Sequence, residues 1–305
     1  MPFDCNVNAR NDIINRVEPS RRSLASAIAS LGNPTPNFKL FHDTIGAISL
    51  KGSTMKKLLL LVCMLAMSAQ LYAENIRVFV AASAKDAMSE VTDTFLKTRK
   101  NDNIELSFGA SGKAYQQFSQ GLEYDLFFSA DSKYPAQIVK DGQAAGEPHV
   151  YVLGVVAFYA LDSKLLEGGV AALKDKEKQI KHLSIANPKV APYGIAAEEI
   201  LKNLKLYDVF ESRIVRGDNI AQAVSFVDSG AAEVGLVAYS LLSDPSKRKN
   251  AVVVDSALLN KMEQSFVITK RAAKSALAKA FSDYITSGKA DEIFKKYGFG
   301  TPARQ

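Results

Sequence analysis

The chain has 305 residues, enough for a large core in one domain or two lobes, and carries 38 Lys and Arg against 32 Asp and Glu. Residues 1–73 hold 8 of the basic and 4 of the acidic residues, which leaves a net charge of only +2 on the rest. The basic residues are scattered and have no interleaved aromatic stripe, so a nucleic-acid partner is not expected.

Residues 55–73 contain the parts of a secretory signal peptide in their usual order. Lys56 and Lys57 form the basic start, an apolar run follows, and the segment ends in the small-residue type of cleavage site. The apolar run is shorter than the roughly 20 residues that span a bilayer. We therefore expect an exported protein that begins at Glu74. We also expect residues 1–54 to be an unfolded extension from a mis-assigned start, upstream of the true initiator Met55.

After the leader, strand patterns alternate with helix patterns, which predicts an α/β fold with mainly parallel sheets. A long apolar run over residues 150–161 is expected to be a strand that crosses between two lobes. The remaining strands are expected over residues 76–82, 104–108, 125–129, 183–186, 233–238, 252–254 and 265–269. Helices are expected over residues 84–97, 112–120, 135–140, 195–204, 220–228, 272–286 and 290–297.

Two strand ends lead directly into helices through serines. Ser83 follows the first strand and is a natural N-cap, with Asp86 three residues later. Ser111 follows the second strand in the same way. A helix start leaves backbone N–H groups unpaired and binds anions without a charged side chain. The pair of serines therefore predicts either an oxyanion site or two ordinary helix caps, and the sequence favours neither.

Catalytic and metal-binding motifs are scarce in this sequence. Gly112-Lys113 does not complete a phosphate loop, because Ser107 stands at the position of the first glycine and Ala114 at that of the Ser or Thr. Both cysteines, Cys5 and Cys63, precede residue 74, so the exported part has no disulfide or thiolate site. With so few nucleophiles and bases, hydrolase chemistry is not favoured.

The segment from Val78 to Gly298 resembles the periplasmic molybdate-binding proteins of ABC importers. The resemblance covers nearly all of the exported part and is specific only when its landmarks are taken together. These landmarks are Ala81-Ala82-Ser83, Ser107-Phe108-Gly109-Ala110-Ser111, Asp125-Leu126-Phe127-Phe128-Ser129-Ala130-Asp131, Ala186-Asn187-Pro188, Ala191-Pro192-Tyr193-Gly194, Gly235-Leu236-Val237-Ala238 and Ile293-Phe294-Lys295-Lys296-Tyr297-Gly298-Phe299.

The resemblance assigns a ligand role to four positions. Ser83 and Ser111 match two anion-contacting positions, Tyr193 stands in the loop of a third contact, and Ile220 matches a residue whose backbone N–H donates a fourth. Some members use a tyrosine where this chain has Ala238. Tyr239 lies one place later, so Tyr193 is expected to supply the phenol instead.

The fold that the resemblance implies is a two-lobed periplasmic binding protein, type II-like, with two crossing strands and a ligand cleft between the lobes. Lobe I is expected over residues 74–152 and 250–305, and lobe II over residues 153–249. No internal repeat or low-complexity linker separates them, so the boundary must be made by the crossing strands themselves.

The resemblance further implies a monomeric, periplasmic solute-binding protein without a cofactor or enzymatic activity. It would capture molybdate or tungstate through Ser83, Ser111, Tyr193 and Ile220 and deliver the anion to an ABC transporter permease. The alternatives are a receptor for sulfate or phosphate and, in a different class, an exported serine hydrolase. Phosphate requires a carboxylate in the cleft to accept its proton, and Asp86 and Asp218 are the candidates.

Overall fold

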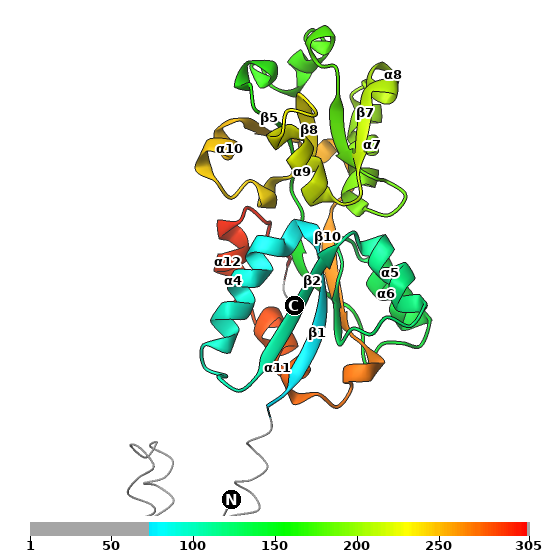
Figure 1. The fold of residues 1–305 in the computed structure, drawn as a ribbon, viewed down its shortest axis with the longest axis vertical. Helices are drawn as coiled ribbons and strands as arrows, with labels where there is room; N and C mark the ends of the chain where they lie inside the picture. Colours follow the sequence, from blue (N-terminus) through cyan, green and yellow to red (C-terminus); the bar gives the residue numbers. More distant parts are fainter. Residues whose placement is uncertain (1–72, 304–305) are drawn as a thin grey trace, which may run out of the picture. The chain divides into compact units, whose positions relative to one another are not determined.

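The computed structural model describes residues 73–303, which form two β-sheets flanked by helices (Figure 1). The expectations for residues 1–54 and for the leader up to Tyr72 lie outside the described residues. Within residues 73–303, no helix is long and apolar enough to cross a membrane. The α/β class predicted from the sequence is confirmed.

The first sheet has five strands in the order β2-β1-β3-β10-β4. β1 pairs in parallel with β2 and β3, whereas β10 is antiparallel to both β3 and β4. The strands span Asn75–Ala81 (β1), Asn103–Gly109 (β2), Leu126–Phe128 (β3), His149–Leu153 (β4) and Glu263–Ile268 (β10).

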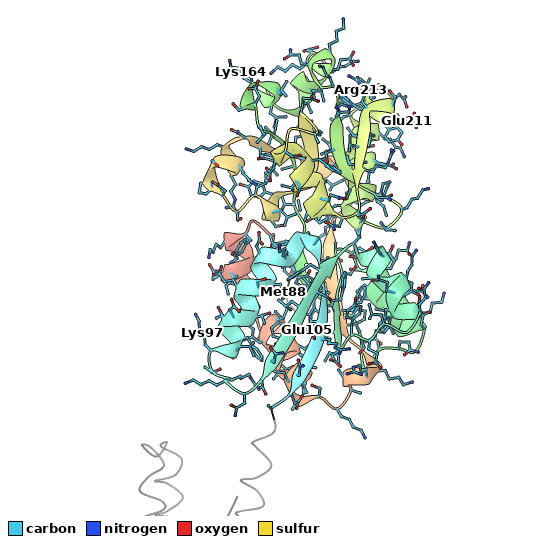
Figure 2. All side chains as sticks on the ribbon, viewed as in Figure 1. Met88, Lys97, Glu105, Lys164, Glu211 and Arg213 are labelled. Carbon is cyan, nitrogen blue, oxygen red and sulfur yellow. The ribbon has the colours of Figure 1, made fainter. Side chains whose placement is uncertain are left out.

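Alternate residues of β1 build the core on the two faces of this sheet, as the period of two in a strand requires. Val78 and Val80 pack on one face with Met88 of α4 (Lys85–Leu96), a fully buried side chain (Figure 2). α11 (Ala276–Thr286) and α12 (Asp291–Lys296) cover the same face. Phe79 packs on the other face against α5 (Ser111–Ser119) and α6 (Lys133–Lys140).

The second sheet has the order β7-β6-β8-β5-β9. Its strands span Val156–Ala160 (β5), Leu183–Ala186 (β6), Ile214–Gly217 (β7), Val234–Ala238 (β8) and Ala251–Val253 (β9). α7 (Pro192–Asn203) and α9 (Ile220–Asp228) pack against it, and α8 (Tyr207–Phe210) and α10 (Pro245–Lys249) are short. The connections contain 3-10 helices at Ala82–Ala84 (η1), Ser163–Leu166 (η2), Val170–Leu173 (η3), Glu177–Gln179 (η4), Glu211–Arg213 (η5), Tyr239–Leu241 (η6), Ser256–Leu258 (η7) and Lys270–Ala272 (η8).

The chain crosses between the two sheets twice, and this corrects two expectations. The apolar run over residues 150–161 is two strands, β4 and β5, which belong to different sheets and are separated by Gly154 and Val155. The second crossing lies between β9 and β10. β9 pairs with β5, so the boundary drawn after residue 249 is too early, because residues 251–253 complete the second sheet.

Both sheets are mixed, so the expectation of mainly parallel sheets was wrong. Four strand pairings are parallel and four are antiparallel. The antiparallel pairings all involve β10 or β5, the strands that enter each sheet from the other. Below, lobe I means the first sheet with its helices (residues 73–153 and 263–303), and lobe II means the second sheet with its helices (residues 156–253).

Candidate functional site

The four residues singled out in the sequence line one small cavity where the two lobes meet. Ser83 and Ser111 come from lobe I, and Tyr193 and Ile220 come from lobe II. All four are at most 4% exposed. The other lining residues are Ala81, Ala82, Gly109, Ala110, Ala130, Ala191 and Pro192.

Helix starts from both lobes converge on this cavity. In lobe I, the neighbouring parallel strands β1 and β2 lead into η1 and α5, and their last residues, Ala81 and Gly109, are register partners that both line it. In lobe II, the neighbouring parallel strands β6 and β7 lead toward α7 and α9. Parallel neighbours end at the same edge of a sheet, so each lobe contributes two helix starts to the cavity, where backbone N–H groups favour an anion.

The two serine hydroxyls do not cap their own helices, which contradicts the cap interpretation. Ser83 lies inside η1 and makes no side-chain cap, and its hydroxyl donates instead to Gln264 Oε1 at 3.3 Å. α4 begins after Ala84, so the expected reciprocal cap with Asp86 does not form. Ser111 is the first residue of α5, and its hydroxyl oxygen accepts the Ala130 N–H at 3.0 Å. The Ser111 proton therefore stays available to a ligand acceptor.

Tyr193 brings a buried phenol to the same place from the first turn of α7. Its hydroxyl oxygen accepts a hydrogen bond from Gln264 Nε2 at 3.1 Å, and the side chain is 1% exposed. Burial raises the pKa of Tyr193, although the hydrogen bond from Gln264 acts in the opposite direction. The phenol therefore stays protonated at neutral pH and can donate to an anion.

Ile220 is the first residue of α9. The residue before it determines which backbone N–H of the first turn remains without a hydrogen-bond acceptor. The Asn219 side chain caps the helix by accepting from Ala221 N at 2.9 Å and from Gln222 N at 3.1 Å. Within the described part of the chain, no acceptor is recorded for the Ile220 N–H. An Asn directly before an apolar helix is the N-cap signal that could have revealed this arrangement from the sequence.

No charged side chain lines the cavity. Asp218 is exposed, Asp86 is half-buried, and neither lines it. The cavity therefore has no carboxylate to accept a proton from a ligand and no histidine to act as a base. Across residues 73–303, no cluster of His, Cys, Asp and Glu could hold a metal ion. The donors present are hydroxyl and backbone N–H groups, which suit an unprotonated anion.

The size of the cavity restricts the ligand further. About 200 Å³ inside it is free of protein atoms, against 970 Å³ in the pocket beside Leu122 and Arg271 and 710 Å³ in the groove beside Asp131 and Lys261. The largest of these three pockets is not lined by the helix starts that meet at the small cavity. The small cavity is therefore the candidate site, and its size suits a small ion rather than a sugar or peptide.

Direct hydrogen bonds hold the lobes together around the cavity. Gly112 N donates to Val190 O at 2.8 Å, and Ser240 Oγ donates to Ser83 O at 2.7 Å. A side chain at Gly112 would place its Cβ only 2.8 Å from Val190 O, so this close approach requires glycine. The lobes therefore stand in a closed arrangement over the site.

Tyr239 does not line the cavity. Its ring lies so close to Gly298 that a Cβ there would come within 2.5 Å of it, and the Arg248 guanidinium lies 5.1 Å from the ring centroid. Arg248 also donates to Lys296 O in lobe I at 3.0 Å. Tyr239 thus packs between the lobes beside the site.

These features agree with the comparison against known families. The model of the bacterial extracellular solute-binding proteins matches residues 76–300. The chain belongs to this family. Its members are solute-binding proteins rather than enzymes, so the serine hydrolase alternative is set aside. A member of this family works outside the cytoplasm.

Among the solute-binding proteins, the similar relatives include molybdate-binding proteins. Molybdate-binding protein ModA of Rhodobacter capsulatus is 34% identical over 223 residues, 73% of this chain and 86% of that protein. Its namesake in Azotobacter vinelandii is 35% identical over 240 residues, 78% of this chain and 93% of that protein. The solved periplasmic molybdate-binding protein of Azotobacter vinelandii matches with a TM-score of 0.69 and 29% identity, covering 75% of this chain and all of the other. The two-lobed fold class is thereby confirmed.

Proposed function

We propose that this chain captures molybdate or tungstate in the periplasm and delivers it, as a monomer, to the membrane permease of an ABC importer. The observation that carries the proposal is the small, uncharged cavity between the lobes, on which helix starts and two serine hydroxyls converge. The similarity to molybdate-binding proteins over most of both chains supports the same ligand.

The ligand would be held by neutral donors in place of its water shell. Ser83, Ser111, Tyr193 and Ile220 line the cavity, and in this proposal three of them give their hydroxyls and Ile220 its backbone N–H. Hydrogen bonds to a charged partner contribute roughly 1.5–3 kcal/mol each. Four of them, aimed into a site that excludes water, suffice to hold a dianion without a cationic side chain.

Closure of the lobes would couple binding to delivery. The donors come in pairs from lobe I and lobe II, so the full set exists only when the lobes meet. The two crossings, at residues 154–155 and 254–262, are the segments that would bend. An anion that bridges the lobes would stabilise the closed arrangement, which the permease would recognise.

Sulfate is the second candidate, because it is also a tetrahedral anion that carries no proton at neutral pH. Phosphate is disfavoured, since the cavity lining offers no carboxylate for its proton. Calorimetric titration with molybdate, tungstate, sulfate and phosphate tests the proposal. We expect molybdate and tungstate to bind and to compete with each other, sulfate to bind more weakly, and phosphate not to bind. Absence of binding by every one of these oxyanions would refute the proposal.

A further inference from the structure

A buried glutamine links the two lobes directly beside the proposed anion site. Gln264 lies at the start of β10 and is 0% exposed. Its Oε1 accepts the Tyr151 hydroxyl at 3.2 Å and the Ser83 hydroxyl at 3.3 Å, while its Nε2 donates to the Tyr193 hydroxyl at 3.1 Å. One amide thus contacts a proposed ligand residue of lobe I and one of lobe II. No sequence motif pointed to this residue.

The backbone around Gln264 is shaped to bring these groups together. The register between β4 and β10 shifts at this point, because Gln264 pairs with Val152 whereas Ser265 pairs with Val150. Tyr151 is the extra residue, and such bulges redirect side chains next to functional sites. Gly154, at the first crossing, passes so close that a Cβ there would lie 2.7 Å from the Tyr193 hydroxyl and 2.8 Å from Gln264 Nε2.

We infer that Gln264 is a positioning residue that turns the Tyr193 hydroxyl proton toward the bound anion. An amide nitrogen can only donate, so in its 3.1 Å bond with Gln264 Nε2 the Tyr193 hydroxyl oxygen is the acceptor. The tyrosine oxygen accepts this bond, so its own proton is left for another acceptor. The inference rests on the proposed function and assigns it a residue that does not itself line the cavity.

A double-mutant cycle in molybdate affinity tests the inference. Gln264→Met keeps the length of the side chain but removes both the donor and the acceptor of the amide. It should weaken binding about tenfold, as should Tyr193→Phe. If Gln264 acts through Tyr193, the double variant should bind no more weakly than Tyr193→Phe alone. Independent losses, roughly a hundredfold in the double variant, would overturn the inference, and so would wild-type affinity of Gln264→Met.

Tyr151→Phe is the matched control, because it removes a bond to the same amide but leaves the donor to Tyr193 in place. We expect it to lower the melting temperature while molybdate affinity stays within about threefold of wild type. Equal losses of affinity in Tyr151→Phe and Gln264→Met would mean that the network is only structural, which contradicts the inference.

Gln264→Glu provides a readout that does not depend on the folding of Gln264→Met. A carboxylate at this position accepts the tyrosine proton and repels the anion, so the affinity of this variant should fall as the pH rises and the new carboxyl ionises. If Gln264→Glu binds molybdate with the affinity of the wild type at every pH, the inference is overturned. If the wild-type protein binds no oxyanion at all, the proposed function fails and this inference fails with it. If the wild-type protein binds molybdate and the Gln264 variants bind it equally well, only the inference fails.

Discussion

At the scale of single residues, the two serines of the site differ in what their hydroxyls already bond. Ser111 accepts from Ala130 N and keeps its proton free, whereas Ser83 donates over a long 3.3 Å bond to Gln264. A ligand oxygen can take the Ser83 proton at little cost, because that bond is weak for its length. Both hydroxyls are thus set to donate to an anion, which an ordinary helix cap is not.

We predict that Ser83→Ala and Ser111→Ala each weaken molybdate binding by roughly 1.5–3 kcal/mol, about tenfold or more, because each removes one donor to a desolvated dianion. Ser89→Ala is the matched control, since Ser89 is half-buried in α4 and bonds only the carbonyl of Lys85. Calorimetric titration measures all three. Wild-type affinity in both site variants would mean that their hydroxyls do not contact the ligand.

For Tyr193 we predict that removal of the hydroxyl, in Tyr193→Phe, weakens molybdate binding by about one charge-assisted hydrogen bond, roughly tenfold. The ring stays in place, so the affinity should change more than the melting temperature. Titration and thermal unfolding of the same variant separate the two effects. Undiminished affinity would falsify the hydroxyl assignment and leave only the backbone as a donor.

The pH dependence of binding follows from the composition of the site. Tyr193 is the only ionisable residue in the lining, and burial raises its pKa above the ordinary value of 10. The neutral donor form is fully present below that ordinary value and is lost only as the pH rises through the higher, folded-state pKa. Molybdate affinity measured between pH 6 and 9 should therefore be flat. A change of affinity with pH in this range would contradict the prediction and would indicate a carboxylate or histidine in contact with the anion.

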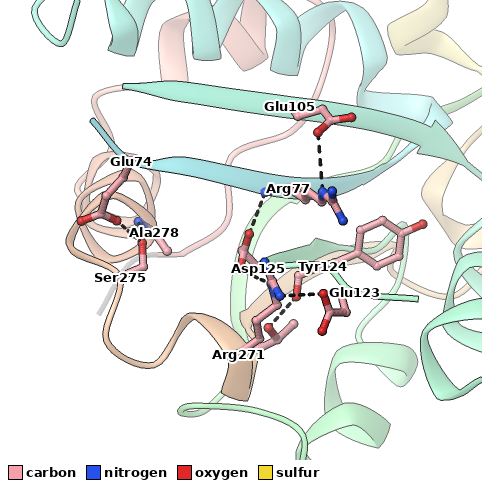
Figure 3. A network of polar contacts seen from close by, with 10 residues as sticks. Glu74, Arg77, Glu105, Glu123, Tyr124, Asp125, Arg271, Ser275 and Ala278 are labelled. Carbon is pink, nitrogen blue, oxygen red and sulfur yellow. Dashed lines mark hydrogen bonds and ion pairs between the residues drawn. The ribbon is translucent and has the colours of Figure 1, made fainter. Parts of the chain in front are cut away.

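At the scale of elements, Glu74 shows how the expected first residue of the exported protein is tied to the fold. Its carboxylate accepts from the Ser275 hydroxyl (Figure 3). It also accepts from Ala276 N and Leu277 N, the first two N–H groups of α11. Its backbone N donates to Asp102 Oδ1 at 3.2 Å. Cleavage before Glu74 would place a new ammonium group at that carboxylate.

We predict that Glu74→Ala lowers the free energy of unfolding by about 1 kcal/mol, because α11 loses acceptors and a negative charge at its N-terminus. Glu105→Ala is the control. Glu105 lies on exposed β2 and pairs with Arg77 at 3.7 Å, a surface pair that contributes at most about 1 kcal/mol and often nothing. Urea denaturation of both variants tests this. Equal stability of Glu74→Ala and wild type would show that the cap is unimportant.

Elements with a strong apolar pattern could be predicted from the sequence, and weakly patterned ones could not. β1, β6 and α9 are found within a residue of their expected bounds. β7 (Ile214–Gly217) was missed, because Ile214 and Val215 are followed by the exposed Arg216 and by a glycine, which leaves no apolar run. α7 begins at Pro192, three residues earlier than expected, because proline fits the first turn of a helix.

At the scale of the whole described part, residues 73–303, the helix starts could be identified from the sequence but not their convergence. Which residues meet depends on strand order, because β1 lies beside β2 and β6 beside β7, and on two crossings that bring the lobes together. The resemblance to a known family supplied that arrangement for Ser83, Ser111, Tyr193 and Ile220. Gln264 could not be found in this way. Its role depends on contacts with Tyr193 and Ser83, which are separated from it in the sequence by 71 and 181 positions.

In the proposed complex, the anion sits between the lobes, against uncharged helix starts. The most direct test is a crystal structure of the protein with molybdate, with the metal located by its anomalous scattering. We predict one strong peak in the small cavity, with oxygens within hydrogen-bonding distance of Ser83 Oγ, Ser111 Oγ and Ile220 N. A peak in the larger pocket beside Arg271, or no peak at saturating molybdate, would contradict it.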